Sequence, residues 1–95
     1  MKLVEWKIEF RKDWNKYFKK FDSNTQKKIF KKLKKMAETM KPRGLHRSRF
    51  CVEEVNQYRI VYTYDDKTNM KSIYFIGNYK QYEKWFRSLE QNTIS

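Results

Sequence analysis

The sequence predicts an α+β fold: a helical hairpin packed on a mostly antiparallel four-stranded sheet, with a short C-terminal helix. Two observations predict this class. Four separate runs have the alternating or β-rich residues of strands, and apolar residues at helical spacing fill the stretch after the first run. Gly and Pro number only 2 and 1, so regular elements should fill most of the chain. The predicted order is β-α-α-β-β-β-α in a single domain, residues 1–95.

The N-terminal half predicts one strand and the helical hairpin. Residues 4–10 alternate apolar and charged side chains, as in a half-buried strand. Aromatic residues then recur at helical spacing over residues 10–21 and predict a first helix. Ser23 and Gln26 have the spacing of a capping box, which predicts that a second helix begins there and runs to about Met40.

The C-terminal half predicts three strands and one helix. Strand-like runs cover residues 49–53, 57–64 and 71–77, and a polar turn at 65–69 joins the last two in a hairpin. Large apolar residues then return to helical spacing and predict the C-terminal helix, with Tyr79, Tyr82, Trp85, Phe86 and Leu89 on its apolar side.

The formal net charge of +12 is the strongest indication of a function class. Residues 1–44 hold 15 Lys and Arg against 5 Asp and Glu, whereas residues 45–95 hold 8 against 6. A polyanion such as RNA, or an acidic protein, is the natural partner of such a surface. A solvated lysine face that only aids solubility is the other interpretation. The second predicted helix contributes the lysines expected to bind RNA, which are Lys27, Lys28, Lys31, Lys32, Lys34 and Lys35.

The sequence favours the cytoplasm and argues against cofactors. Cys51 is the only cysteine, so no internal disulfide forms, and the N-terminus lacks the continuous apolar core of a signal peptide. No apolar run approaches the roughly 20 residues of a membrane span. No cluster of metal ligands and no Gly-rich phosphate loop occurs in the sequence, so no metal or nucleotide cofactor is expected.

The central strand carries the first candidate site residue. Side chains alternate across a sheet, so Arg59 lies on the face opposite to Ile60 and Tyr62. With both hairpin helices expected on the tyrosine side, Arg59 is expected on an open face. Its guanidinium is suited to holding a phosphate through two hydrogen bonds. Pairing with Glu53 or Glu54, to hold the sheet, is the alternative.

Three segments resemble the RelE/ParE superfamily of bacterial and archaeal toxins. They are Trp6–Phe10 with the lysine-rich aromatic stretch after it, Gln57–Tyr62 with its Tyr-Arg-Ile-Val-Tyr sequence, and Ile73–Asn78 with its Ile-Gly pair. The resemblance implies a toxin that is neutralised by an antitoxin encoded beside it.

The superfamily contains two activities, and the resemblance favours the first. RelE-like members cleave mRNA in the ribosomal A site without a metal, by attack of a ribose 2′-hydroxyl on the adjacent phosphate. ParE-like members inhibit DNA gyrase instead. We expect a ribosome-dependent endoribonuclease; a ParE-like gyrase inhibitor, and an inactive RelE-fold domain that binds RNA or protein, stay open as alternatives.

The resemblance also implies roles for individual residues. Arg59 matches the family's phosphate-binding arginine, and Trp85 falls where many RelE-like toxins have a base-stacking tyrosine. Tyr79 stands at the place of a second arginine, which leaves that role to Lys80 or Lys84. Trp85 and its neighbour Phe86 are also the expected contact with the antitoxin.

On the preceding strand, Arg47 and Arg49 are the nearest counterparts of the paired lysines of RelE, and Cys51 occupies another matching position. His46, the only histidine, is a candidate acid or base.

Carboxylates and tyrosines complete the set of candidates. Glu53 and Glu54 are candidate bases, or they neutralise Arg59. Tyr79 and Tyr82 are suited to stacking on RNA bases and equally to packing the last helix on the sheet.

Overall fold

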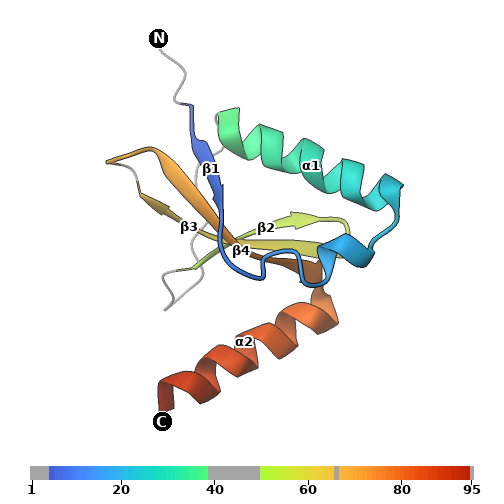
Figure 1. The fold of residues 1–95 in the computed structure, drawn as a ribbon, viewed down its shortest axis with the longest axis vertical. Helices are drawn as coiled ribbons and strands as arrows, with labels where there is room; N and C mark the ends of the chain where they lie inside the picture. Colours follow the sequence, from blue (N-terminus) through green and yellow to red (C-terminus); the bar gives the residue numbers. More distant parts are fainter. Residues whose placement is uncertain (1–4, 39–49, 66, 95) are drawn as a thin grey trace.

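The computed structural model describes residues 5–38, 50–65 and 67–94. Within these ranges the elements are, in chain order, strand β1 (Lys7–Phe10), the 3-10 helix η1 (Phe18–Lys20), helix α1 (Ser23–Glu38), strands β2 (Cys51–Val55), β3 (Tyr58–Asp65) and β4 (Met70–Asn78), and helix α2 (Tyr79–Ile94) (Figure 1). The predicted α+β class is confirmed.

The four strands form one mixed sheet in the order β1-β4-β3-β2. β1 runs parallel to β4, and the other two pairs are antiparallel, as a mostly antiparallel sheet requires. The predicted β3–β4 hairpin is present. In its turn the backbone N–H of Lys67 donates to Asp65 Oδ1 at 2.9 Å, and Asn69 takes a left-handed φ of 54°, which asparagine tolerates.

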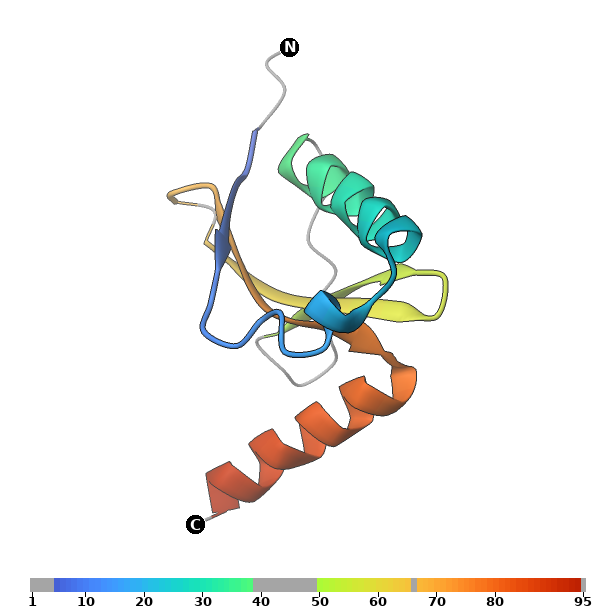
Figure 2. The ribbon, with the colours of Figure 1, turned by 45° about the vertical axis from the view of Figure 1, so that its right-hand side comes forward.

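The two α-helices lie on opposite faces of the sheet. α1 covers one face and α2 crosses beneath the other, as the two views agree (Figures 1 and 2). The predicted helical hairpin on one face is wrong, because of its two helices only α1 is present in the described chain. α2 spans 16 residues and is as long as α1, rather than short.

The predicted helix over residues 10–21 is wrong: the described chain forms turns there, followed by η1. Asp13 has a left-handed φ of 64°, and Lys16 N–H donates to the Asp13 carbonyl at 3.2 Å in a four-residue turn. Aromatic side chains lose rotamer freedom in a helix, and Asp and Asn favour turns. The turns also let Phe18 enter the core on the α1 side while Tyr17 packs on the other side.

Asp22, rather than the predicted Ser23, caps the N-terminus of α1. Its Oδ1 accepts the backbone N–H of Thr25 at 3.3 Å, and this hydrogen bond lowers the pKa of the Asp22 carboxyl below its ordinary value. The side chain of Gln26 does not complete a capping box, because its Nε2 donates to the carbonyl of Phe18 at 3.0 Å. Gln26 thereby ties α1 to η1.

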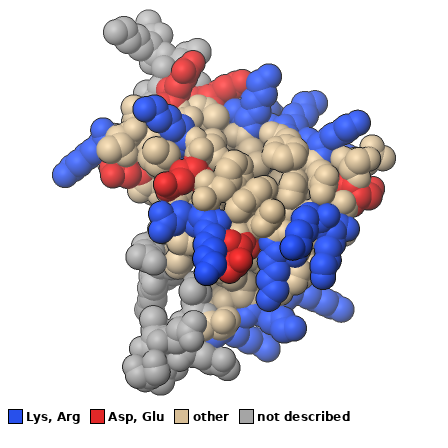
Figure 3. Space-filling model, in the orientation of Figure 1, with Lys and Arg blue, Asp and Glu red and all other residues tan. Residues whose placement is uncertain are grey.

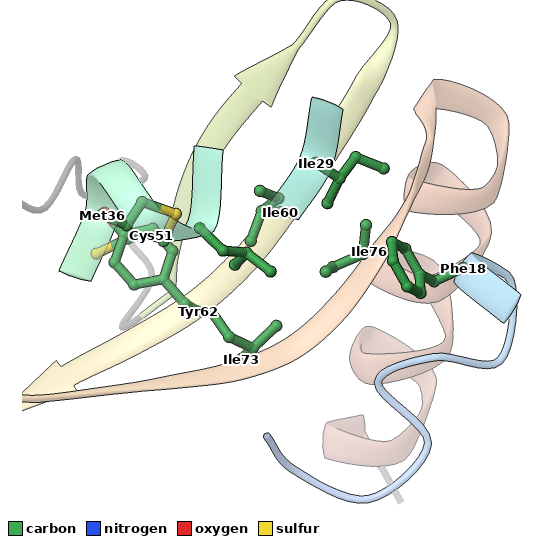
Figure 4. Packing of buried hydrophobic residues seen from close by; sticks show 9 residues of the cluster. Phe18, Ile29, Met36, Cys51, Ile60, Tyr62, Ile73 and Ile76 are labelled. Carbon is green, nitrogen blue, oxygen red and sulfur yellow. The ribbon is translucent and has the colours of Figure 1, made fainter. Parts of the chain in front are cut away.

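The main core lies between α1 and the sheet (Figure 4). Ile29, Leu33 and Met36 follow one another by four and three residues, so they share one helix face. They pack on residues that project from the strands to the same side, which are Cys51, Ile60, Tyr62, Ile73 and Ile76. The apolar spacing that predicts this helix is thus matched by the burial of Ile29, Leu33 and Met36, whereas Phe30 of the same apolar set is exposed.

A second, smaller core lies on the α2 face. Phe50, Val61 and Phe75 are buried there, with Tyr82 and Trp85 of α2 packed against them. A register shift between Val61 and Tyr62 lets Phe75 pair with Val61 and face α2. The face that was expected to be open is therefore covered in part by α2.

Candidate functional site

The start of α2 is fixed by two reciprocal hydrogen bonds. The backbone N–H of Asn78 donates to Gln81 Oε1 at 2.8 Å, and the backbone N–H of Gln81 donates to Asn78 Oδ1 at 2.9 Å. This is the geometry of a capping box, here with Asn as the cap. Because Asn78 is also the last residue of β4, the box sets the direction in which α2 leaves the sheet.

Arg59 lies in β3 beside this junction. It is paired in register with Gly77 of β4 and with Glu54 of β2. Its guanidinium carbon lies 4.8 Å from the ring centre of Tyr79 and 5.0 Å from that of Tyr82, within the range of cation–π attraction. Its Nη2 lies 3.6 Å from Glu54 Oε1.

A shallow hollow opens at Arg59. It has a volume of about 320 Å³ and is lined by Arg59, Tyr79, Tyr82, Glu83, Phe86 and Arg87. The Tyr79 hydroxyl is hydrogen-bonded to Glu83, which raises the pKa of Tyr79, with a further contribution from the negative charge of Glu83. Tyr79 therefore holds its proton more firmly than an ordinary tyrosine.

The two neighbouring glutamates point to opposite faces of the sheet. Glu54 shares the face of Arg59, in agreement with the predicted pairing. Glu53 is buried on the α1 face, where its Oε1 lies 3.6 Å from Lys32 Nζ. Because side chains alternate along a strand, Glu53 can be neither the ion-pair partner of Arg59 nor a base beside it.

A larger groove runs between the turn segment at residues 12–17 and α2. Its volume is about 890 Å³. Five cationic residues line it, together with two carboxylates, four aromatic rings and one serine: Lys12, Lys16, Lys80, Lys84, Arg87, Asp13, Glu83, Tyr17, Tyr74, Phe75, Trp85 and Ser88. Trp85 stacks on Phe75 with 5.5 Å between ring centres and meets Phe50 edge-on at 5.3 Å, so it serves the second core as well.

The structure separates the predicted site residues into two neighbouring places. Tyr79 and Tyr82 join Arg59 in the hollow, whereas Lys80, Lys84 and Trp85 line the groove. Arg87 and Glu83 line both and were not among the predicted residues. Glu83 and Arg87 follow Tyr79 at intervals of four residues, which places all three on one side of a helix. This spacing is the sequence signal that could have identified them.

Other predicted residues lie elsewhere. His46, Arg47 and Arg49 fall outside the described residues. Lys32 is half-buried and forms an ion pair with Glu53. The other predicted lysines of α1 are exposed, namely Lys27, Lys28, Lys31, Lys34 and Lys35. Lys12 and Lys16 were not predicted, because in a helix over residues 10–21 both lysines would lie on the solvent side, whereas the observed turns bring them to the groove.

Cys51 is buried in the main core, and burial raises the pKa of its thiol. It lies on the α1 face, so it does not take part in the hollow. Across the described ranges, no group of three or more His, Cys, Asp or Glu side chains gathers in the manner of a metal site. No helix in these ranges has the length and apolar character to cross a membrane.

Comparison with solved structures finds the same fold in bacterial toxins. The toxin–antitoxin complex RelBE2 from Mycobacterium tuberculosis aligns with a TM-score of 0.72 and 15% identity, over 81% of this chain and 94% of that one. The intact E. coli RelBE complex aligns with a TM-score of 0.62 and 18% identity, over 77% and 95%. A mutant of E. coli RelE in the free state gives 0.68 and 15%, over 92% and 97%.

No protein-family model and no curated protein matches the chain. The resemblance seen in three short segments is nevertheless confirmed at the level of the fold, which is that of the RelE toxins.

Proposed function

We propose that this protein is a cytoplasmic toxin of a toxin–antitoxin pair, an endoribonuclease that cleaves mRNA on the ribosome. The observation that carries the proposal is the placement of Arg59 against two tyrosine rings and 3.6 Å from the Glu54 carboxylate, at a solvent-open hollow. A cation, a carboxylate and aromatic rings in one place are groups that a metal-independent cleavage of RNA requires. The RelE-like fold and the net charge of +12 support the same activity.

The proposed reaction gives one role each to Arg59 and Tyr82 of the hollow and to Glu54, the ion-pair partner of Arg59. Arg59 binds the scissile phosphate, and because the phosphate competes for the guanidinium, the Glu54 carboxylate is released to act as base. Glu54 takes the proton of the 2′-hydroxyl while that oxygen attacks phosphorus. The bond from phosphorus to the 5′-oxygen breaks, and the Tyr82 hydroxyl donates a proton to the leaving oxygen. The products are a 2′,3′-cyclic phosphate and a 5′-hydroxyl, and solvent returns both residues to their starting protonation.

The groove beside α2 supplies a path for the RNA strand. Lys80, Lys84 and Arg87 line it from α2, and Lys12 and Lys16 line it from the turn segment, so the backbone phosphates meet cations on both sides. The five exposed lysines of α1 face away from this path and are suited to anchoring the protein on ribosomal RNA.

An antitoxin is the expected protein partner. Two of the similar solved structures are toxin–antitoxin complexes, and the cationic surface of this chain suits an acidic partner. Trp85 is half-buried because it packs on Phe50 and Phe75, so an antitoxin that binds Trp85 and Phe86 has to compete with these contacts of the second core.

The test is cleavage of a translated mRNA followed by primer extension, with wild type, Arg59→Ala, Arg59→Lys and, as a control, Lys67→Ala. Lys67 is exposed in the β3–β4 turn, so the control removes one positive charge away from the hollow. We expect Arg59→Ala to lose at least a hundredfold in cleavage, Arg59→Lys to lose less, and Lys67→Ala to match wild type.

Cleavage by Arg59→Ala at the wild-type rate would overturn the site. Inhibition of gyrase supercoiling by the wild type, without mRNA cleavage, would support the ParE-like alternative. RNA binding with neither activity would support the inactive RNA-binding domain.

A further inference from the structure

A row of four aromatic rings lies on the α1 side of the sheet, the opposite face from the Arg59 hollow. The ring centres of Phe10 and Trp14 are 4.3 Å apart, those of Trp14 and Phe18 are 5.2 Å apart, and those of Phe18 and Phe30 are 5.2 Å apart. These four residues, called the aromatic row below, connect the end of β1 to α1 through the turn segment. Trp14 and Phe18 belong to the main core, which explains the inner part of the row.

The ends of the row are not explained by the core. Phe10 is 42% exposed and Phe30 is 49% exposed, whereas Phe18 between them is 5% exposed. Two exposed phenylalanines, joined through Trp14 and Phe18, form the ends of an apolar strip. Contiguous exposed apolar surface of this kind marks an interaction site more often than a chance exposure does.

Cations border the aromatic row. Lys27 and Lys34 stand one helical turn before and after Phe30, so they lie on the same side of α1 as this ring. Lys19 and Lys20 are exposed in η1, beside Phe18. Over residues 11–38 the sequence holds eleven Lys and Arg against three Asp and Glu. Figure 3 shows one face on which a continuous uncharged area is bordered mostly by Lys and Arg.

We propose that the aromatic row docks an acidic amphipathic helix of a protein partner. One apolar stripe of a helix, with anchors at i, i+4 and i+7, extends about 10 Å, which suits a narrow strip of a few rings. Acidic residues on the flanks of that helix meet the lysine border.

Other occupants agree less well with the same observations. A second copy of this chain carries the same charge of +12, so like charges oppose self-association through this surface. A single-stranded RNA stacks its bases on exposed ring faces, and Phe18 within the row is only 5% exposed, so the row offers few faces for such stacking. An antitoxin of the proposed toxin is a natural carrier of such a helix, but the docking site holds whether or not the Arg59 hollow is catalytic.

The test uses two fluorescein-labelled 18-residue peptides of identical composition. One places Leu and Trp on a single helical stripe with Glu elsewhere, and the other has the same residues in scrambled order. Fluorescence anisotropy measures their binding to the full chain, to Phe10→Ser/Phe30→Ser, and to Tyr64→Ser. Tyr64 is 47% exposed and does not belong to the aromatic row, so it is the matched control.

We expect the amphipathic peptide to bind at least tenfold more tightly than the scrambled one, and the double variant to lose this preference. The Tyr64→Ser variant should keep it, and circular dichroism should show that all three proteins are folded. Equal binding of both peptides, or an unchanged preference in the double variant, would overturn the proposal.

Two further arms use other probes. Loss of binding to a single-stranded oligoribonucleotide, or to vesicles of phosphatidylglycerol and phosphatidylcholine, in Phe10→Ser/Phe30→Ser but not in Tyr64→Ser would assign the row to RNA or lipid instead. Retained mRNA cleavage by the double variant is expected, because the row and the Arg59 hollow lie on opposite faces. That readout separates this proposal from the proposed function.

Discussion

The Nζ of Lys71 donates a hydrogen bond of 2.9 Å to the carbonyl oxygen of Met36, in the last turns of α1. Lys71 is a β4 residue with no exposed surface, and its ammonium also lies 4.9 Å from the ring centre of Trp6. A cation at the C-terminal end of a helix satisfies a carbonyl that has no partner within the helix. Lys71 thus joins the parallel β1–β4 pair of the sheet to the C-terminal end of α1.

Burial lowers the pKa of Lys71 below its ordinary value of 10.5, against the opposing effect of Glu53. Between the lowered pKa and 10.5, the unfolded chain binds more protons at this residue than the folded chain does. The free energy of unfolding therefore gains a contribution as the pH rises through this window, and the burial penalty is at its full size below it.

We expect wild type to gain stability relative to Lys71→Met as the pH rises from 7 towards 10. Urea unfolding at a series of pH values, followed by circular dichroism, measures the difference. Both proteins carry Cys51→Ala in this comparison, because Lys71 itself lowers the pKa of the Cys51 thiol against the effect of burial. A difference in unfolding free energy that does not change with pH would show that Lys71 titrates alike in the folded and unfolded chain.

Asp22 gives a second pH-dependent prediction, of the same sign but in the acid range. Its hydrogen bond to Thr25 holds the carboxyl pKa below the ordinary 3.8, so its contribution to stability is present above that value and lost as the pH falls through the lowered pKa. Asp22→Ala should lower the Tm at pH 7, and Asp22→Ser, which keeps an acceptor, should restore most of the loss. Thermal scans at pH 7 and pH 3 should show a smaller gap between wild type and Asp22→Ala at pH 3; an equal gap would refute the role of the charge.

Elements with a local signal could be predicted from the sequence. The buried stripe of Ile29, Leu33 and Met36 and the β-rich run before the 65–69 turn each carry a periodicity that the fold preserves. The spacing of the aromatic residues over 10–21 is compatible with a helix and also with a series of turns. Spacing alone therefore predicted the wrong element there. The left-handed Asp13 decides between them, and only tertiary packing selects that conformation.

The position of α2 depended on a long-range relation. The residues of α2 (Tyr79–Ile94) do not by themselves indicate which face of the sheet the helix covers. Val61 does indicate it, because this apolar residue lies on the same strand face as Arg59 and has to be shielded from water. That signal was present in the alternation of β3. A helix that covers Val61 also brings the tyrosines of α2 over Arg59, where the structure has them.

Gly77 tests how closely β4 and α2 approach. A Cβ at this position would lie 2.5 Å from Phe75 Cζ and 2.8 Å from Gln81 Oε1, the acceptor of the capping box. Gly77→Ala should therefore destabilise the protein by about 1–3 kcal/mol, as overpacked substitutions do. Chemical unfolding checks this, with Ser88→Ala on the exposed side of α2 as the control. A Gly77→Ala protein as stable as wild type would show that the junction has room.

Glu54 is the sharpest test of the assigned chemistry, since the proposed base and the proposed phosphate ligand are neighbours. Glu54→Gln keeps the size of the side chain and removes its charge and basicity. Glu54 is exposed, so the loss of its ion pair with Arg59 should cost no more than about 1 kcal/mol of stability. Cleavage of translated mRNA should nevertheless fall by about 10²–10⁴-fold, the usual contribution of a general base.

The matched control is Glu5→Gln, which removes the same charge from an exposed residue that precedes β1. It should cleave like wild type. The rate of Glu54→Gln should also lose the acid limb of the pH profile, because the carboxyl proposed as the base has been removed. A variant that keeps both the wild-type rate and the acid limb would assign the base elsewhere and leave Glu54 with its ion pair alone.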